Sequence, residues 1–245
     1  MVSGRWTVTL LAALALLAGC SDRSGAPGAE QRVDPADYTS FFLWAGVKPP
    51  PELSRATELY ILGGEVKAED ADTYVPMRAG VPRLADKQVW LVVRAARLDW
   101  GEGVHRAVLT DLARWERAGN AVAGLQVDFD AATRGLDGYA DFLSALRQRL
   151  PARYQLSVTG LMDWSAHGDP AALARLAGIV DEVVVQSYQG RSTIPGYADY
   201  LNRLARVPIP HKVALVQGGE WQEPAALRSD PGFRGYVVFL VNPAH

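Results

Sequence analysis

The sequence is poor in the residues that build covalent cross-links and metal centres. It has one cysteine and four histidines among 245 residues. A single cysteine excludes a disulfide framework within the chain and any metal site made of several thiolates. The histidines are scattered, and no pair has metal-ligand spacing, His105 and His167 included. We therefore expect no metal and no other cofactor.

A strong net charge is also missing. Lysine and arginine together number 25 against 27 acidic residues, for a formal charge of −2, and no basic patch stands out. This balance gives no electrostatic basis for a nucleic-acid partner. The hydrophobic content of 49% is enough to bury one substantial core, and barrels of this length are commonly a single domain.

The N-terminus carries an apolar run that is too short to span a membrane. In "MVSGRWTVTLLAALALLAGC", an arginine precedes an apolar segment and small residues follow it, as in a secretory signal. Residues 17–20, Leu-Ala-Gly-Cys, resemble the bacterial lipobox, in which the cysteine is acylated. Ser21 in the next position resembles the sorting pattern for the outer membrane. The alternative is an ordinary signal peptide with a chance cysteine.

The N-terminal pattern predicts a domain organisation and a location. Residues 1–20 are expected to be a lipoprotein signal, with Cys20 as the lipidation site. Residues 21–37 are small, polar and rich in proline and glycine, which is typical of a flexible tether. Residues 38–245 remain for the folded domain. We expect a protein of the cell envelope, held to the outer membrane by its lipid anchor and facing the periplasm.

Eight apolar runs of strand length follow. Most are apolar on both faces, as parallel strands buried on both sides are. They lie at 40–46, 58–65, 88–95, 124–131, 154–161, 182–189, 212–219 and 235–242.

Helical patterns separate several of these runs. Helices are predicted over 104–119, 136–150, 169–180 and 195–207, the third with Asp169 as its N-cap. The alternation predicts a small α/β protein with a (β/α)8 TIM-like barrel that lacks its last helix. An open doubly wound sheet is the second alternative, but no glycine-rich phosphate loop follows any run.

Polar residues interrupt the apolar pattern late in the fourth run. Side chains alternate along a strand, so residues two apart share a face. We expect Gln126, Asp128 and Asp130 to point into the barrel. Val127 and Phe129 then face the helices.

The same reasoning applies to the sixth and seventh runs. Gln186 and Tyr188 are expected to point inward from the sixth. Val213, Leu215 and Gln217 are expected to do so from the seventh. Early strand positions are mostly apolar, so the polar residues should gather at the C-terminal mouth, where barrels of this type place their active sites.

Further polar and aromatic residues stand at the ends of other runs. These are Glu65, Arg94, Asp163, Trp164 and Asn242. Strand ends border loops, and loops are polar in any case, so a purely structural origin is the alternative. We favour a functional site because Asp128 and Gln186 interrupt otherwise apolar strands.

The two aspartates of the fourth run can serve acid–base chemistry. Their Cα atoms should lie about 6.6 Å apart. Like charges at close range raise one pKa, whereas a neighbouring Arg94 or Arg97 would lower both. A protonated and an ionised carboxyl side by side is what hydrolysis of a glycosidic bond requires.

"GLQVDFDAAT" and "VVVQSYQG" resemble strands four and six of the family-18 glycoside hydrolases. Asp128 and Asp130 match the second and third acids of that family's Asp-x-x-Asp-x-Asp-x-Glu motif, and Tyr188 matches its tyrosine. The resemblance implies that Asp130 and Tyr188 hold the substrate. Leu125 replaces the first aspartate, however, and Ala132 replaces the proton-donating glutamate, so that mechanism does not carry over intact.

A broader resemblance includes "LVVRA", "LSVTGLMDW" and "VDEVVVQSYQ" and covers most of the chain after the tether. It is to a bacterial domain of unknown function, family 3142, which implies a glycosidase-like barrel and no particular activity. Glu65 and Asp163 are the candidates to replace the missing acid, with Asp128 or Asp130 as partner.

Three functions are consistent with these residues. The first is an enzyme that binds or hydrolyses a glycan of the cell wall or capsule. Its expected binding residues are Arg94, Gln126, Trp164, Gln186, Tyr188, Gln217 and Asn242. The second is a non-catalytic barrel that binds a saccharide or a protein. The third, metal-dependent hydrolysis, needs histidines near the acids, and no suitable spacing is present.

Overall fold

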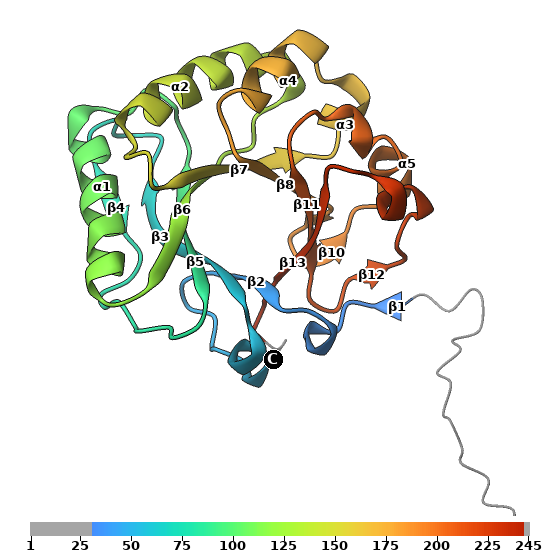
Figure 1. Ribbon diagram of the computed structural model, residues 1–245, viewed down its shortest axis with the longest axis horizontal. Coiled ribbons are helices and arrows are strands. Elements are labelled where there is room, and N and C mark those ends of the chain that lie inside the picture. The colour runs from blue at the N-terminus through green and yellow to red at the C-terminus, as the bar shows by residue number, and fades with distance from the viewer. Residues whose placement is uncertain (1–30, 243–245) are drawn as a thin grey trace, which may run out of the picture.

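Eight parallel strands close into a barrel in the computed structural model, which describes residues 31–242 (Figure 1). The order around the barrel is β2-β3-β5-β6-β7-β8-β11-β13, and β2 pairs with both β3 and β13. This closure confirms the (β/α)8 barrel over an open sheet. The barrel strands are β2 (Ser40–Leu43), β3 (Glu58–Val66), β5 (Gln88–Ala95), β6 (Ala121–Asp128), β7 (Gln155–Leu161), β8 (Glu182–Gln186), β11 (His211–Val216) and β13 (Phe233–Phe239).

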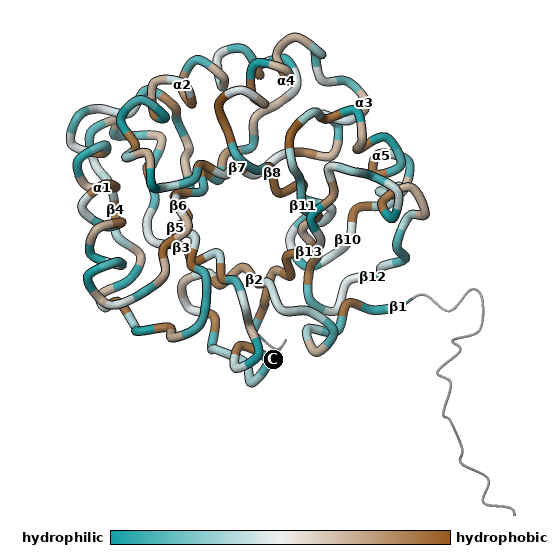
Figure 2. Tube along the Cα trace, viewed as in Figure 1, coloured by the Kyte–Doolittle hydropathy of each residue, from teal (hydrophilic) through white to brown (hydrophobic). Residues whose placement is uncertain are grey.

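The strands are apolar on both faces because each face meets a different core. Val183 and Val185 belong to the large cluster between the strands and the surrounding helices. Val184 belongs to the smaller cluster inside the barrel. Figure 2 shows the hydrophobic colour concentrated on the strands, with hydrophilic residues on the outer turns.

The helices lie outside the ring of strands (Figure 1). They are α1 (Glu102–Arg117), α2 (Leu136–Arg149), α3 (Trp164–His167), α4 (Pro170–Ala177) and α5 (Tyr197–Leu201). Asp169 caps α4 as expected, its carboxylate accepting from the backbone N–H groups of Ala171 and Ala172. The helix expected at 195–207 is divided into α5 and a 3-10 turn.

Short elements complete the fold. The two- and three-residue strands are β1 (Gln31–Arg32), β4 (Tyr74–Pro76), β9 (Tyr188–Gln189), β10 (Ser192–Thr193) and β12 (Glu220–Trp221). The 3-10 helices are η1 (Pro35–Asp37), η2 (Pro51–Arg55), η3 (Thr133–Gly135), η4 (Leu204–Arg206) and η5 (Ala225–Ser229). No helix follows β13 among the described residues.

The segment between β3 and β5 forms part of the rim. β4 pairs antiparallel with the end of β3, and Gly64 lies so close to the Tyr74 ring that a Cβ there would clash with it. The Arg78 guanidinium donates to the Leu43 and Leu62 carbonyls at 2.9 and 3.1 Å. It thereby satisfies backbone oxygens where β2 and β3 stop pairing.

Residues 31–37 pack on the barrel, although they fall in the range assigned to the tether. Val33 is buried and exchanges backbone hydrogen bonds of 2.9 Å with Gly218 and Gly219, just after β11. The signal segment, Cys20 and the rest of the tether lie outside the described residues. Within residues 31–242, no helix is long and apolar enough to cross a membrane.

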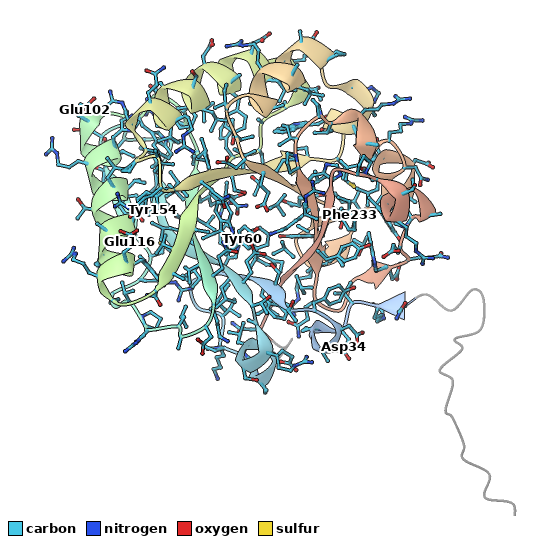
Figure 3. All side chains as sticks on the ribbon, in the orientation of Figure 1. Asp34, Tyr60, Glu102, Glu116, Tyr154 and Phe233 are labelled. Atoms are coloured by element: carbon cyan, nitrogen blue, oxygen red, sulfur yellow. The ribbon has the colours of Figure 1, made fainter. Side chains whose placement is uncertain are left out.

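A cluster of charged residues fills the N-terminal end of the barrel. The Lys212 ammonium lies between two carboxylates, at 2.7 Å from both oxygens of Glu58 and 3.0 Å from Glu182. The Tyr60 hydroxyl donates to Glu182 at 2.7 Å, and the Trp90 indole donates to Glu58 at 3.0 Å. Tyr60 points into the middle of the ring in Figure 3. We call these five residues the basal cluster.

The basal cluster corrects two expectations. Early strand positions are not only apolar, because β3, β8 and β11 each place a charged residue inside the barrel near its start. The inward face of β11 is also the opposite of the one expected. Lys212, Ala214 and Val216 point inward, and Val213 and Leu215 pack against the helices.

Candidate functional site

A cavity of about 570 Å³ opens at the C-terminal mouth of the barrel. This volume falls in the range of small-molecule sites. Its lining comes from every barrel strand except β3, or from the residues just beyond these strands. The lining residues are Phe42, Trp44, Arg94, Ala95, Ala96, Asp128, Phe129, Asp130, Thr159, Val184, Gln186, Tyr188, Gly190, Ala214 and Phe239.

Asp128 is the last residue of β6 and is partly buried in this mouth. One of its oxygens accepts a hydrogen bond of 3.0 Å from the Thr159 hydroxyl, on the adjacent strand β7. Burial raises the pKa of Asp128 to about 6, against the lowering effects of the Thr159 hydrogen bond and the Arg94 charge. Asp128 can therefore hold or release a proton near neutral pH.

Glu65, Arg94 and Asp128 stand side by side on β3, β5 and β6. Glu65 pairs in register with Arg94, and Arg94 with Asp128. The Arg94 guanidinium is 4.0 Å from Glu65 and lies over the Trp44 ring, 5.4 Å from its centroid. Arg97 is removed from the site by a two-pronged pair with Asp99, at 2.7 and 2.6 Å. Arg94 is thus the arginine that acts on the carboxylates of the mouth.

Asp130 lies two residues beyond β6, with its side chain exposed in the cavity. Within the described chain, its carboxylate has no hydrogen bond or ion pair with any other side chain. Both of its oxygens are thus open to a ligand.

Tyr188 and Gln186 cover the β8 side of the cavity. Tyr188 is 8% exposed and packs against Phe239, with ring centroids 5.4 Å apart. Its hydroxyl has no hydrogen-bond partner among residues 31–242. Burial and the charges of Asp128 and Asp130 raise the pKa of Tyr188 well above its usual value, so this hydroxyl keeps its proton. The Gln186 amide donates to the Tyr188 carbonyl at 2.8 Å and holds this turn in place.

The remaining wall of the cavity is largely apolar and includes several aromatic rings. Trp44 meets Phe239 edge-on at 5.7 Å, and Phe42 packs on Phe239 at 6.5 Å. The mouth therefore combines flat apolar surfaces with a few charged groups, which is the composition of a site for a polar ring compound.

Five of the expected site residues line this cavity, namely Asp128, Asp130, Arg94, Gln186 and Tyr188. Glu65 lies beside it, on a groove of about 260 Å³ that shares Arg94 and Ala96 with the main cavity. Gln126 is fully buried below the mouth, where it donates to Ser157 at 2.9 Å.

The other expected residues have structural partners elsewhere. The Trp164 indole is buried in the outer core and donates to the Ala131 carbonyl at 2.9 Å. The residues of β11 that point inward are Lys212, Ala214 and Val216, so Gln217 belongs to the opposite face. Its side-chain oxygen accepts from the Val241 N–H at 3.1 Å. Asn242 bonds to Gly46 and Lys48, outside the cavity.

Asp163 also lies away from the cavity lining. It precedes α3, and one of its oxygens is buried without a hydrogen-bond partner. Burial raises the pKa of Asp163. Its unpaired oxygen is turned into the protein, so it does not face a ligand at the mouth.

The sequence reading missed Thr159, Phe42 and Phe239. Thr159 interrupts the apolar run "LSVTGL" two residues from its end, and this signal could have identified it. Phe42 and Phe239 carry no such signal, since aromatic residues in strands are usually core. Residues 31–242 contain no group of three or more His, Cys, Asp or Glu side chains placed to hold a metal ion.

Comparison with known proteins agrees with the fold. The crystal structure of the tamarind chitinase-like lectin has a TM-score of 0.50 at 12% identity, over 82% of this chain and 94% of that one. The Bacillus cereus spore cortex-lytic enzyme SleL has a TM-score of 0.48 at 19% identity, over 72% of this chain. The chitinase domain of the spore coat protein CotE from Clostridium difficile has 0.43 at 13%, over 78% of this chain.

At these identities the likeness concerns the fold. The chain spans 49% of SleL and 66% of the CotE domain. No curated protein matches this sequence. Residues 87–207, which run from β5 through η4 and carry Arg94, both aspartates and Tyr188, match the family described as "Domain of unknown function (DUF3142)", as the sequence motifs led us to expect.

Proposed function

We propose that the mouth of the barrel binds a segment of a glycan. The observation that carries this proposal is the composition of the cavity. Aromatic faces from Trp44, Tyr188 and Phe239 meet the carboxylates of Asp128 and Asp130 in a volume of about 570 Å³. Sugar rings stack on aromatic faces through their C–H groups, and their hydroxyls hydrogen-bond to carboxylates.

The position of the cavity supports the same proposal. Active and binding sites of (β/α)8 barrels lie at the C-terminal mouth, built from the strand ends. The tamarind protein that shares this fold is called a chitinase-like lectin, which agrees with saccharide binding without turnover. Ala132, in place of an acidic residue, also favours binding over the family-18 reaction.

Hydrolysis is the second candidate, and the pKa of Asp128 favours it. A carboxyl group with a pKa of about 6 can donate a proton to a leaving oxygen near neutral pH. Asp130 or Glu65 would then serve as the second carboxylate. This route does not require an acidic residue at position 132.

One experiment separates the two candidates. Soluble protein starting at Ser21 is incubated with a panel of oligosaccharides and peptidoglycan fragments, and binding and product release are recorded together. Release that disappears in Asp128→Asn but persists in Asp199→Asn, a change at an exposed residue of α5, indicates hydrolysis, and loss of release in Asp130→Asn as well identifies Asp130 as the second carboxylate. Binding without release indicates a lectin-like barrel. Absence of both across the panel contradicts the proposal.

We also propose that the chain works at the cell envelope, anchored in the outer membrane through lipid on Cys20 and facing the periplasm. The lipobox-like sequence before Cys20 supports this. Membrane fractionation of cells that express the full chain or Cys20→Ser tests it. We expect the full chain in the outer-membrane fraction and the variant outside it. Equal distribution of the two contradicts lipid anchoring.

A further inference from the structure

The charges that face the mouth are unbalanced. Two carboxylates and one guanidinium line the cavity, and Glu65 adds a third carboxylate at its edge. Arg94 lies within ion-pair distance of Glu65 and over Trp44, so much of its charge is balanced by Glu65. Among residues 31–242, Asp130 therefore has no ion-pair partner, and Asp128 has only the longer-range charge of Arg94.

The other arginines near the mouth are engaged elsewhere. Arg97 pairs with Asp99. Arg78 donates to two backbone carbonyls of the barrel wall. Arg191, next to Gly190 on the rim, donates to the Asn242 carbonyl at 2.6 Å. None of the three lines the cavity, so none offsets the two aspartates within it.

A second and independent feature points to a ligand at the same place. Tyr188 is more than nine-tenths buried and lines the cavity, yet its hydroxyl has no partner in the described chain. The hydroxyl oxygen is not one of the fully enclosed atoms that lack a partner, so it is accessible from the cavity. It is positioned to hydrogen-bond to a ligand that also meets the carboxylates.

From this arrangement we propose that the ligand is a sugar that carries a free primary amine, as a deacetylated amino-sugar polymer does. This inference rests on the proposed function and adds the substrate class. A protonated amine satisfies Asp130 by a charge-assisted hydrogen bond. It is also attracted by the faces of the aromatic rings that surround the carboxylates.

The same charges discriminate against other sugars. A uronic acid would bring a third negative charge to the two aspartates, with only Arg94 to receive it. An N-acetylated sugar replaces the cation by a neutral amide and loses the ion pair. Discrimination therefore depends on the charge of Asp130, not on the shape of the pocket.

The test compares two ligands of equal length and linkage. A β-1,4-linked glucosamine oligomer and its fully N-acetylated counterpart are titrated calorimetrically into protein starting at Ser21. The pH is kept below the amine pKa of the probe and the salt is low. We expect the amine form to bind about tenfold more tightly, which corresponds to about 1.4 kcal/mol.

Two variants show whether the preference arises at the mouth. In Asp130→Asn we expect the preference to fall to less than about threefold, because the amine form loses an ion pair with this carboxylate and the acetylated oligomer loses at most a neutral hydrogen bond. In Asp199→Asn, which removes one exposed carboxylate that does not line the cavity, the preference should persist. A preference that survives Asp130→Asn overturns the proposal, because it must then come from general attraction to an acidic protein.

The outcomes separate this inference from the proposed function. Equal or tighter binding of the acetylated oligomer overturns the amine preference and leaves glycan binding intact. Tight binding of a uronate oligomer does the same. If no oligosaccharide binds at all, both proposals fail together.

Discussion

The two ends of the barrel place similar acidic residues in opposite electrostatic states. At the N-terminal end, burial alone would raise the pKa of Glu58, but the charge and hydrogen bonds of Lys212, with those from Ser40 and Trp90, lower it below its usual value. At the C-terminal mouth, burial raises the pKa of Asp128 to about 6, and a single hydroxyl from Thr159 does not reverse this.

The two ends differ in the number of partners that each carboxylate has. Each member of the basal cluster is hydrogen-bonded within the cluster, so its charges stabilise one another once folded. At the mouth, Asp130 and the Tyr188 hydroxyl have no partner in the described chain. Charged groups that stabilise the fold have partners within it, whereas groups that bind a ligand often have none. Groups without a partner lower the stability of the fold.

Removal of the cation should break the basal cluster most severely. Lys212→Met leaves Glu58 and Glu182 close together without a counter-charge. We expect the free energy of unfolding to fall by about 3–5 kcal/mol at neutral pH, measured by urea denaturation. Lys48→Met, at an exposed lysine whose ammonium has no partner in the described chain, should change it by less than about 0.5 kcal/mol.

The pH dependence of the same variant sharpens this test. In the parent protein the lowered pKa of Glu58 contributes stability that is lost as pH falls through its folded-state value. In Lys212→Met the two glutamates repel, so acid should instead recover part of the lost stability. A variant that loses less than about 1 kcal/mol and shows the parent's pH profile contradicts the role given to the cluster.

At the mouth, removal of a charge should raise the free energy of unfolding instead of lowering it. The folded-state pKa of Asp128, about 6, lies above its ordinary value of 3.8, so its carboxylate costs stability as pH rises through this interval. Asp128→Asn keeps an acceptor for Thr159 and should stabilise the protein by up to about 3 kcal/mol at pH 7.

The gain in Asp128→Asn should vanish near about pH 4, where the parent carboxyl is already protonated. Thermal unfolding of both proteins across this range measures it. The exposed-site variant Asp199→Asn provides the control. If Asp128→Asn is less stable than the parent at neutral pH, Asp128 has an ionic partner that stabilises its charged form.

A matched pair of tyrosine variants compares the ends with one chemical change. Tyr60→Phe removes a hydroxyl that donates to Glu182 and accepts from Lys212 at 2.9 Å. We expect a loss of about 1–3 kcal/mol in stability. Tyr188→Phe removes a hydroxyl with no described partner, so stability should change by less than about 0.5 kcal/mol.

Saccharide binding should be affected more by Tyr188→Phe than by Tyr60→Phe, the reverse of the order expected for stability. Tyr188→Phe is expected to weaken saccharide binding about three- to tenfold, through one lost hydrogen bond. Tyr60→Phe, at the other end of the barrel, should leave binding unchanged at temperatures where the variant is folded. Equal effects of the two variants on stability would remove the contrast between the ends.

Much of the fold follows from local patterns. All eight barrel strands lie where the apolar runs predict them, since runs apolar on both faces require burial on both sides. The expected inward face of β6 and β8 is correct as well. β11 is the exception, because its inward lysine is compatible with burial only through Glu182 and through Glu58, which lies 154 residues earlier in the chain.

The candidate site was predictable to a similar extent. Asp128 and Tyr188 could be identified because polar groups interrupt apolar strands at the mouth. Trp44 and Trp164 both follow strands, and the sequence does not distinguish them. The direction of the chain beyond each strand distinguishes the two tryptophans. It turns the Trp164 indole to the Ala131 carbonyl and leaves the Trp44 ring beneath Arg94.

The sequence by itself determined the number of strands, their alternation with helices and the end of the barrel at which the aspartates gather. These features depend on periods of two and about four residues, which are local. Only the tertiary structure decided which charges are paired. Barrel closure brings Lys212 to two glutamates and sets Arg94 between Glu65 and Asp128, and a pKa depends on such neighbours, however far apart they lie in the chain.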